Sequence, residues 1–181
     1  MLNEMKSRLE TYRLGKKVNR LLYCLTLVLM TACTPAKKAT TNNPELEKEK
    51  QAVIKVIQTM FDGMRAGDST MVRSAFYKNA TMLSTFRNRQ QQPKIHKGDL
   101  EKFLVAVGTP HEEVWDERIK SYEVKIDATL ATAWTEYAFY LGDKFSHCGV
   151  NAFHLFKSEE GWKIFHLADT RRKSSCEESK K

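Results

Sequence analysis

The chain has 181 residues and a formal net charge of +8, a length that allows one ordinary domain with a real hydrophobic core. Half of that charge lies in the first 32 residues, and the remainder shows no basic stripe interleaved with aromatic residues. Nucleic acid is therefore not an expected partner, and the short basic run 171–173 is interpreted as a solvated strand end.

The N-terminal residues have the layout of a secretory signal. A basic leader precedes a short apolar run, and small residues then precede Cys33. The run has about half of the roughly 20 apolar residues that a membrane span needs. Its end resembles the lipobox of bacterial lipoproteins, which implies cleavage before Cys33 and lipidation of its thiol. The alternatives are a transmembrane helix and a buried helix of a cytosolic protein.

The signal pattern and the composition of the segments after it predict the organisation of the whole chain. Residues 1–32 are expected to be a signal peptide, 33–44 a flexible tether, 45–173 the folded domain and 174–181 a disordered tail. The protein is expected in the bacterial cell envelope, lipid-anchored on the periplasmic side or at the outer membrane. An oxidising compartment permits a disulfide between Cys148 and Cys176, but we expect two free thiols.

Hydrophobic periodicity predicts helices first and strands afterwards. Helical spacing is followed by period-two alternation from Val114 onward. Short turns between long strands indicate an antiparallel meander, and the layout is α+β: three N-terminal helices packed on a strongly curved antiparallel sheet. The expected helices are 45–65, 70–76 and 97–107, and the expected strands are 80–86, 114–127, 130–141, 145–157 and 161–171.

Several sequence pieces together resemble the nuclear transport factor 2-like superfamily, in its SnoaL-like and putative lumazine-binding branch. They are FDGMRAGDSTMVRSAF, ATMLSTF, KGDLEKFLVAVG and the closing GWKIFHLADTRR. The resemblance implies a cone-shaped α+β barrel with a cavity, and a habit of dimerising through the convex face of the sheet. The superfamily contains both enzymes and noncatalytic modules, so the fold does not fix the function.

The turns at 142–143 and 159–160 predict the register of the last three strands. Two-residue loops place Tyr137 opposite Cys148 and His154 opposite Phe165. Alternation then puts Tyr137, His154, Asp169 and Arg171 at one end of the concave face, whose middle is apolar. A β-bulge would exchange the two faces beyond it.

This polar end is the first candidate site. Asp169 or His154 is expected to act as a base, and Tyr137 to donate a hydrogen bond to a developing enolate. Arg171 is expected to hold an anionic ligand group, with Tyr122 and Trp115 also contacting the ligand. The alternative is a structural Asp169–Arg171 ion pair beside a core histidine.

A second candidate, which gains if a bulge shifts the register, lies on the opposite face and comprises Glu136, His147, Asn151 and His166. No metal site and no cofactor are expected, because no Cys-x-x-Cys pair exists and His147 and His154 point to opposite faces. A sheet that is apolar on both sides predicts a homodimer through its convex face.

We therefore expect a membrane-anchored domain that binds a small apolar molecule with a polar end. Any reaction would be cofactor-free proton transfer, such as isomerisation, dehydration or cyclisation. The alternative is a noncatalytic dimeric interaction module of the cell envelope. A deep cavity with a carboxylate or imidazole in its floor would favour the first function. A cavity filled by its own side chains, beside an exposed aromatic patch, would favour the second.

Overall fold

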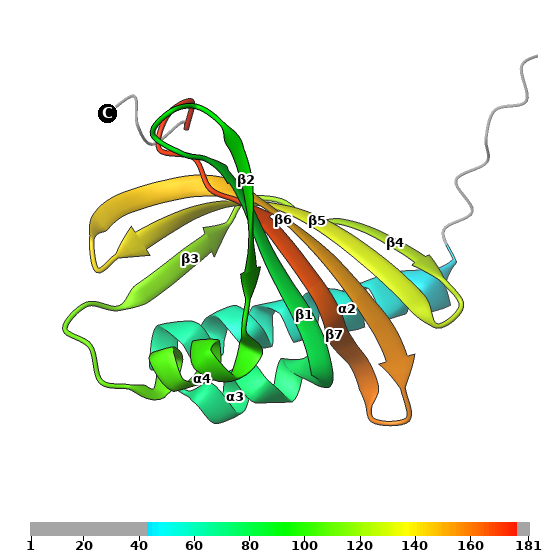
Figure 1. Ribbon diagram of the computed structural model, residues 1–181. Coiled ribbons are helices and arrows are strands. Elements are labelled where there is room, and N and C mark those ends of the chain that lie inside the picture. The colour runs from blue at the N-terminus through cyan, green and yellow to red at the C-terminus, as the bar shows by residue number, and fades with distance from the viewer. Residues whose placement is uncertain (1–42, 177–181) are drawn as a thin grey trace, which may run out of the picture. The chain divides into compact units, whose positions relative to one another are not determined.

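A computed structural model describes residues 43–176, and the compact unit to which they belong spans Asn42–Lys181 (Figure 1). The predicted signal peptide, Cys33, nearly all of the tether and the last five residues of the predicted tail lie outside the described residues. Within 43–176, no helix is long and apolar enough to cross a bilayer.

Local sequence signals set the ends of the first two helices. Helix α2 (Pro44–Ala66) begins at the N-cap Asn43, whose side chain accepts a hydrogen bond from the backbone N–H of Glu45. It ends at Gly67, which has a φ of 68°, a left-handed conformation that glycine adopts without steric cost. Helix α3 (Ser69–Ala75) is capped by Asp68. The predicted break between two helices at this point is confirmed.

The third helix begins later than predicted because a short strand precedes it. Residues 93–98 form β2 (Pro93–Gly98), which pairs with the end of β1 (Phe76–Arg87) in an antiparallel hairpin. The Asp99 side chain then accepts a hydrogen bond from the N–H of Lys102 and starts α4 (Leu100–Gly108). The polar composition of 93–98 concealed this edge strand.

The remaining chain forms five strands rather than the expected four. The predicted strand 114–127 is interrupted at 120–122, and both of its halves pair with β5. The strands are β3 (Trp115–Ile119), β4 (Glu123–Asp127), β5 (Leu130–Leu141), β6 (Lys144–Ser158) and β7 (Gly161–Thr170).

The strands form one curved sheet in the order β2-β1-β7-β6-β5-β3, with β4 also on β5 (Figure 1). The α+β class with three helices on a curved sheet is confirmed. The sheet is mixed rather than purely antiparallel, because β1 runs parallel to β7. It is also not closed: β2 pairs only with β1, and β3 only with β5. Parallel pairing of distant strands leaves no turn signal in a sequence.

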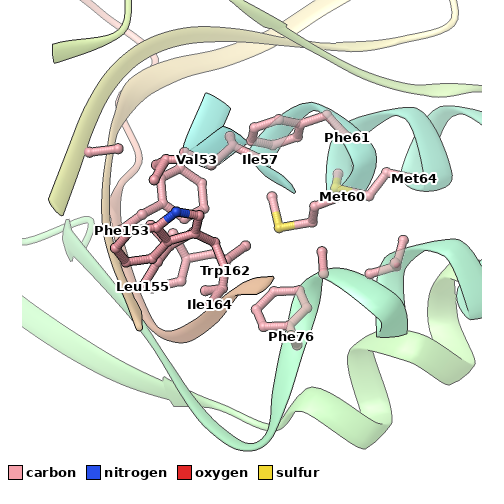
Figure 2. Close-up of a cluster of buried hydrophobic side chains, with 14 of the residues drawn as sticks. Val53, Ile57, Met60, Phe61, Met64, Phe76, Phe153, Leu155, Trp162 and Ile164 are labelled. Atoms are coloured by element: carbon pink, nitrogen blue, oxygen red, sulfur yellow. The ribbon is translucent and has the colours of Figure 1, made fainter. Parts of the chain in front are cut away.

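The helices bury the apolar face of α2 against the middle of the sheet's inner face. Figure 2 shows side chains of α2, including Ile57 and Phe61, beside Phe153, Leu155 and Trp162 of the sheet. Phe153, Leu155 and Ile57 are completely buried. Side chains therefore fill this part of the space between helices and sheet, where the sequence predicted a hollow.

Two β-bulges overturn the predicted register, one at Ser146 of β6 and one at Phe165 of β7. One lies between the pairs Phe139↔His147 and Tyr140↔Phe145, and the other between His154↔His166 and Leu155↔Ile164. Each adds one residue to a strand. As a result Tyr137 lies opposite Gly149 instead of Cys148, and His154 lies opposite His166 instead of Phe165. The central part of β6 consequently presents the opposite set of side chains to the core.

The expectation of free thiols is also wrong, because Cys148 and Cys176 form a disulfide. After β7 the chain continues along β6 in the same antiparallel register, so that Arg172 makes an isolated bridge with Cys148, and it then bends back over residues 173–175. This return brings Cys176, which is 28 residues away in sequence, to the thiol of Cys148. Residues 174–176 of the predicted disordered tail are thereby tied to the sheet.

Candidate inner polar site

A row of polar side chains crosses the inner face of the sheet at one end of the core. Thr135, Asn151, Asp169 and Ser84 are direct cross-strand neighbours on β5, β6, β7 and β1. Residues that are opposite each other share a face, so all four point the same way. Glu117 of β3 joins them from the far edge. We call these five residues the inner polar row.

Hydrogen bonds connect the members of the inner polar row. The Asn151 amide donates to the Glu117 carboxylate at 2.7 Å and to the Thr135 hydroxyl at 3.4 Å. The Ser84 hydroxyl donates to the Asp169 carboxylate. Asn151 and Thr135 are buried, whereas Glu117, Asp169 and Ser84 are only partly buried. The row therefore has a fixed, buried centre and ends that solvent can reach.

Glu117 is the carboxyl group of the row whose pKa is raised into the neutral range. Burial raises its pKa to about 7, and the negative charge of Asp169 adds to this increase. The hydrogen bond from Asn151 and the positive charge of Arg171 act in the opposite direction. A carboxyl group with a pKa near 7 exists in both protonation states at neutral pH, so it can both accept and donate a proton.

Arg171 follows the row and pairs with one of its carboxylates. Its Nε lies 2.8 Å from Oδ2 of Asp169, and its side chain remains 58% exposed against 12% for Asp169. The ion pair expected as the alternative is therefore present. Because the guanidinium has further N–H donors and faces solvent, it can still receive an anionic group.

Tyr137 lies beside the row but its hydroxyl is already in use. The ring is buried, and the hydroxyl donates to the backbone carbonyl of Thr170 at 2.8 Å. Burial raises the pKa of Tyr137. Opposite it, a Cβ on Gly149 would lie 1.8 Å from the Thr170 carbonyl oxygen and 2.8 Å from the Tyr137 hydroxyl. This close packing makes Tyr137 a support of the strand end in this structure, and not a free donor to ligand.

His147 borders the row beside the Tyr137 ring, with centroids 5.8 Å apart. Its pKa is lowered, first by burial and then by the positive charge of Arg171. The imidazole is therefore held in its neutral form, able to accept a proton only below the usual range. It belonged to the second candidate set, and the bulge at Ser146 brings it to the inner face.

His154 lies on the other side of the sheet, away from Tyr137, Asp169 and Arg171. There it stacks on His166 at a centroid distance of 5.2 Å and lines a shallow hollow of about 760 Å³. His166 in turn contacts the Thr81 hydroxyl at 2.7 Å. We call this surface the outer aromatic patch; it comprises Tyr77, Trp134, His154, Phe156, Phe165 and His166.

The two predicted aromatic contacts have different positions. Trp115 is two residues before Glu117 on β3, on the same inner face, and stacks on His111 at 4.7 Å. It can therefore border a ligand at the row. Tyr122 lies between β3 and β4 and hydrogen-bonds Gln58 of α2, away from the row. Both pack against the hydrophobic core.

Sequence reasoning missed Glu117 altogether and assigned Asn151 to the opposite face. The available signal for Glu117 was its alternation with Trp115 and Ile119, which already pointed to the inner side. For Asn151 no local signal existed, because its face depends on a bulge. Among residues 43–176, no group of three potential ligands could hold a metal ion.

The sequence profile of the family described as putative lumazine-binding matches residues 48–166. The chain belongs to this family. No curated protein matches the chain. The family description names a small molecule, which agrees with the expectation of a ligand-binding fold.

Solved structures share the fold at low sequence identity. A nuclear transport factor 2-like protein of unknown function from Shewanella baltica has a TM-score of 0.53 and 18% identity, covering 71% of this chain and 97% of its own. A putative dehydratase of the same family from Streptomyces avermitilis has a TM-score of 0.52 and 10% identity, and the match covers 70% of this chain and 98% of the dehydratase. A putative ketosteroid isomerase from Shewanella frigidimarina has a TM-score of 0.50 and 15% identity, and the match covers 67% of this chain and 96% of the isomerase. The nuclear transport factor 2-like fold is thus confirmed.

Proposed function

We propose that this domain binds a small molecule with a polar end at the inner polar row, and that Glu117 exchanges a proton with it. The observation that carries the proposal is the Glu117–Asn151 hydrogen bond, which holds a carboxyl group with a pKa near 7 beside partly exposed charged groups. The family description and the neighbours described as an isomerase and a dehydratase support it.

Each residue of the row has a role in this proposal. Asn151 and Thr135 are positioning residues, because they fix the Glu117 carboxylate from the buried side. Arg171 anchors an anionic or carbonyl oxygen of the ligand, and Trp115 covers its apolar part. Deprotonated Glu117 takes a proton from an acidic carbon and returns it to another position, which is the balance of an isomerisation. His154 has no part in this reaction because it is on the outer face.

Binding is tested with lumazine as the probe, by fluorescence titration at pH 7. Glu117→Gln keeps the shape of the side chain and its bond to Asn151 but removes the charge, so we expect at least tenfold weaker binding. His154→Ala is the matched control on the outer face, and its affinity should change less than twofold. Loss of binding in His154→Ala with retention in Glu117→Gln would overturn the inner site.

Proton exchange is tested with whatever molecule accompanies the protein from its own host, identified by native mass spectrometry. In deuterated water the wild-type chain should introduce deuterium into that molecule, and Glu117→Gln should do so at least a hundredfold more slowly. Equal rates in both chains would leave Glu117 with a binding role only.

We also propose that the protein is a lipoprotein of the cell envelope, acylated at Cys33. The Cys148–Cys176 disulfide supports this proposal, since disulfides form and persist mainly in oxidising compartments. Cys33→Ala should abolish labelling by a radioactive fatty acid and release the protein from the membrane fraction. An unlabelled wild-type protein in the cytoplasm would contradict both points.

The second candidate function is a noncatalytic dimeric module, and both features expected of such a module favour it: side chains fill the space between α2 and the middle of the sheet, and the outer aromatic patch is exposed. Trp134 is 51% exposed, and on the same face of the sheet Tyr77 and Phe156 meet edge to face at 4.9 Å. Water-exposed aromatic clusters of this kind mark protein contacts. We propose a homodimer through this patch; it leaves the inner polar row free, so dimerisation and ligand binding are compatible.

A further inference from the structure

One end of the molecule concentrates positive charge outside the inner polar row. The β1–β2 hairpin contains no Asp or Glu between Phe76 and Gly98. The basic strand end that follows β7 lies beside it, since the N–H of Arg171 donates to the Thr85 carbonyl (Figure 1). We call the exposed cations here the basic tip; they are Arg87, Arg89, Lys94, Lys97, Arg172 and Lys173.

The basic tip is not neutralised within the part of the chain that the structure describes. None of its six cations forms an ion pair with a carboxylate of residues 43–176, whereas Arg171 beside it is paired with Asp169. Arg87 and Arg172 contact only backbone carbonyls, of Gln91 and Ser175. Six cations that have no carboxylate partner among residues 43–176 generate in one region a potential that attracts an anionic surface.

Apolar side chains accompany these charges. Ile95 is 65% exposed on the face of the hairpin that carries Arg87 and Lys97, and Phe86 is 38% exposed on the opposite face beside Lys94. A surface that combines unpaired cations with exposed apolar side chains suits the boundary between lipid headgroups and acyl chains. Phosphates of nucleic acid would use the cations but would leave Ile95 in water.

We propose that the basic tip docks on a membrane surface of anionic phospholipid. The proposed anchor at Cys33 lies ten residues before Asn43, and ten residues span at most about 35 Å. An anchored domain would therefore stay within reach of the bilayer, where the tip would hold it in one orientation. The docking itself requires neither the anchor nor a ligand at the inner polar row.

The test uses the chain from Thr34 onward, which contains the whole compact unit and its core. Its affinity for vesicles of phosphatidylglycerol and phosphatidylcholine is measured by co-sedimentation, with pure phosphatidylcholine for comparison. We expect binding only to the anionic vesicles, weakening as salt is added. Arg87→Glu/Arg89→Glu/Lys94→Glu should lose at least a hundredfold in affinity.

The matched control reverses three exposed lysines elsewhere: Lys55→Glu/Lys102→Glu/Lys144→Glu. It changes the net charge equally and should keep the affinity within fivefold. If the triple-glutamate tip variant does not fold, Arg87→Gln/Arg89→Gln/Lys94→Gln replaces it, with an expected loss of at least tenfold. Ile95→Ser should weaken binding several-fold at any salt concentration.

Three results would overturn the proposal: equal losses in the tip and control variants, equal binding to neutral vesicles, or tighter binding to duplex DNA than to anionic vesicles. Lumazine titration of the tip variants separates this proposal from the previous one. An unchanged lumazine affinity beside lost vesicle binding supports independent surfaces.

Discussion

Asn151 shows how one side chain can organise a site. Its amide is buried and bridges Glu117 and Thr135, so the carboxyl group is held where solvent reaches it only in part. Without the charge of Arg171 and the Asn151 hydrogen bond, burial and Asp169 would raise the pKa of Glu117 further. The pKa of Glu117 thus reflects burial and the charge of Asp169, which raise it, and the Asn151 hydrogen bond and the charge of Arg171, which lower it.

This balance predicts a pH-dependent stability. The pKa of Glu117 is raised from 4.5 to about 7 by folding, so the folded state binds the proton more tightly than the unfolded state. Stability should therefore fall as the pH rises from about 4.5 to 7. Glu117→Gln, which stays neutral, should be more stable than wild type at pH 8, by on the order of 2 kcal/mol, and equal to a protonated wild type at pH 4.

Urea unfolding at pH 4, 6 and 8 measures this difference. The control is Glu112→Gln, at an exposed glutamate in the loop before β3, and this variant should keep the fall in stability between pH 4 and 8. A Glu117→Gln chain with the same pH dependence as wild type would show that the Glu117 carboxyl is not desolvated.

At the scale of elements, the register of β6 determines which of its side chains lie on the inner face of the sheet and which lie on the outer face. The bulge at Ser146 brings His147 and Asn151 to the inner face and carries His154 to the outer face, and the second bulge, at Phe165 of β7, keeps Asp169 on the inner face. The disulfide then ties the chain after β7 to β6, close to Tyr137 and its bond to the Thr170 carbonyl. The disulfide and the hydrogen bond from Tyr137 to the Thr170 carbonyl therefore both hold the end of the sheet beside the inner polar row.

The contribution of the disulfide can be measured. It closes a loop over a sequence separation of 28 residues, for which chain entropy predicts about 3.6 kcal/mol of stabilisation. Cys176→Ser and Cys148→Ser should each lower the free energy of unfolding by roughly that amount, and the double variant should lose no more than either single one. Urea unfolding of the wild type with and without reductant provides the control. A reduced wild type as stable as the oxidised one would contradict the expectation.

At the scale of the whole molecule, the three proposed surfaces lie on different parts of one sheet. The inner face holds the polar row, the outer face holds the aromatic patch, and the hairpin end carries the basic tip. The proposed ligand, second copy and membrane would therefore occupy separate surfaces and would not compete. Figure 1 shows the hairpin projecting beyond the helices that cover the inner face.

The proposed homodimer can be tested by placing a charged side chain in the outer aromatic patch. Trp134→Glu places a carboxylate where apolar surface would be buried, so sedimentation should show a monomer at concentrations at which wild type is dimeric. Val105→Glu is the control, because Val105 is 69% exposed on α4, outside the patch. A wild-type monomer, or an unchanged dimer of Trp134→Glu, would exclude this interface.

Much of the fold could be predicted because local rules govern it. The end of α2 at Gly67, the cap at Asp68 and the tight turn at Gly142 each depend on a few neighbouring residues. The candidate site was predicted only in part. Asp169 and Arg171 are on the expected face, whereas His154 is not, and Glu117 was overlooked.

The sequence by itself determined the helices, the turns and the family, since periodicity and caps are local properties that packing does not reverse. Tertiary structure alone decided the face of β6, the Cys148–Cys176 pairing and the meeting of Glu117 with Asn151. A bulge inserts one residue where curvature of the whole sheet requires it, and every side chain beyond it changes face. No window of sequence contains that curvature, so contacts between strands 34 residues apart become visible only in the folded chain.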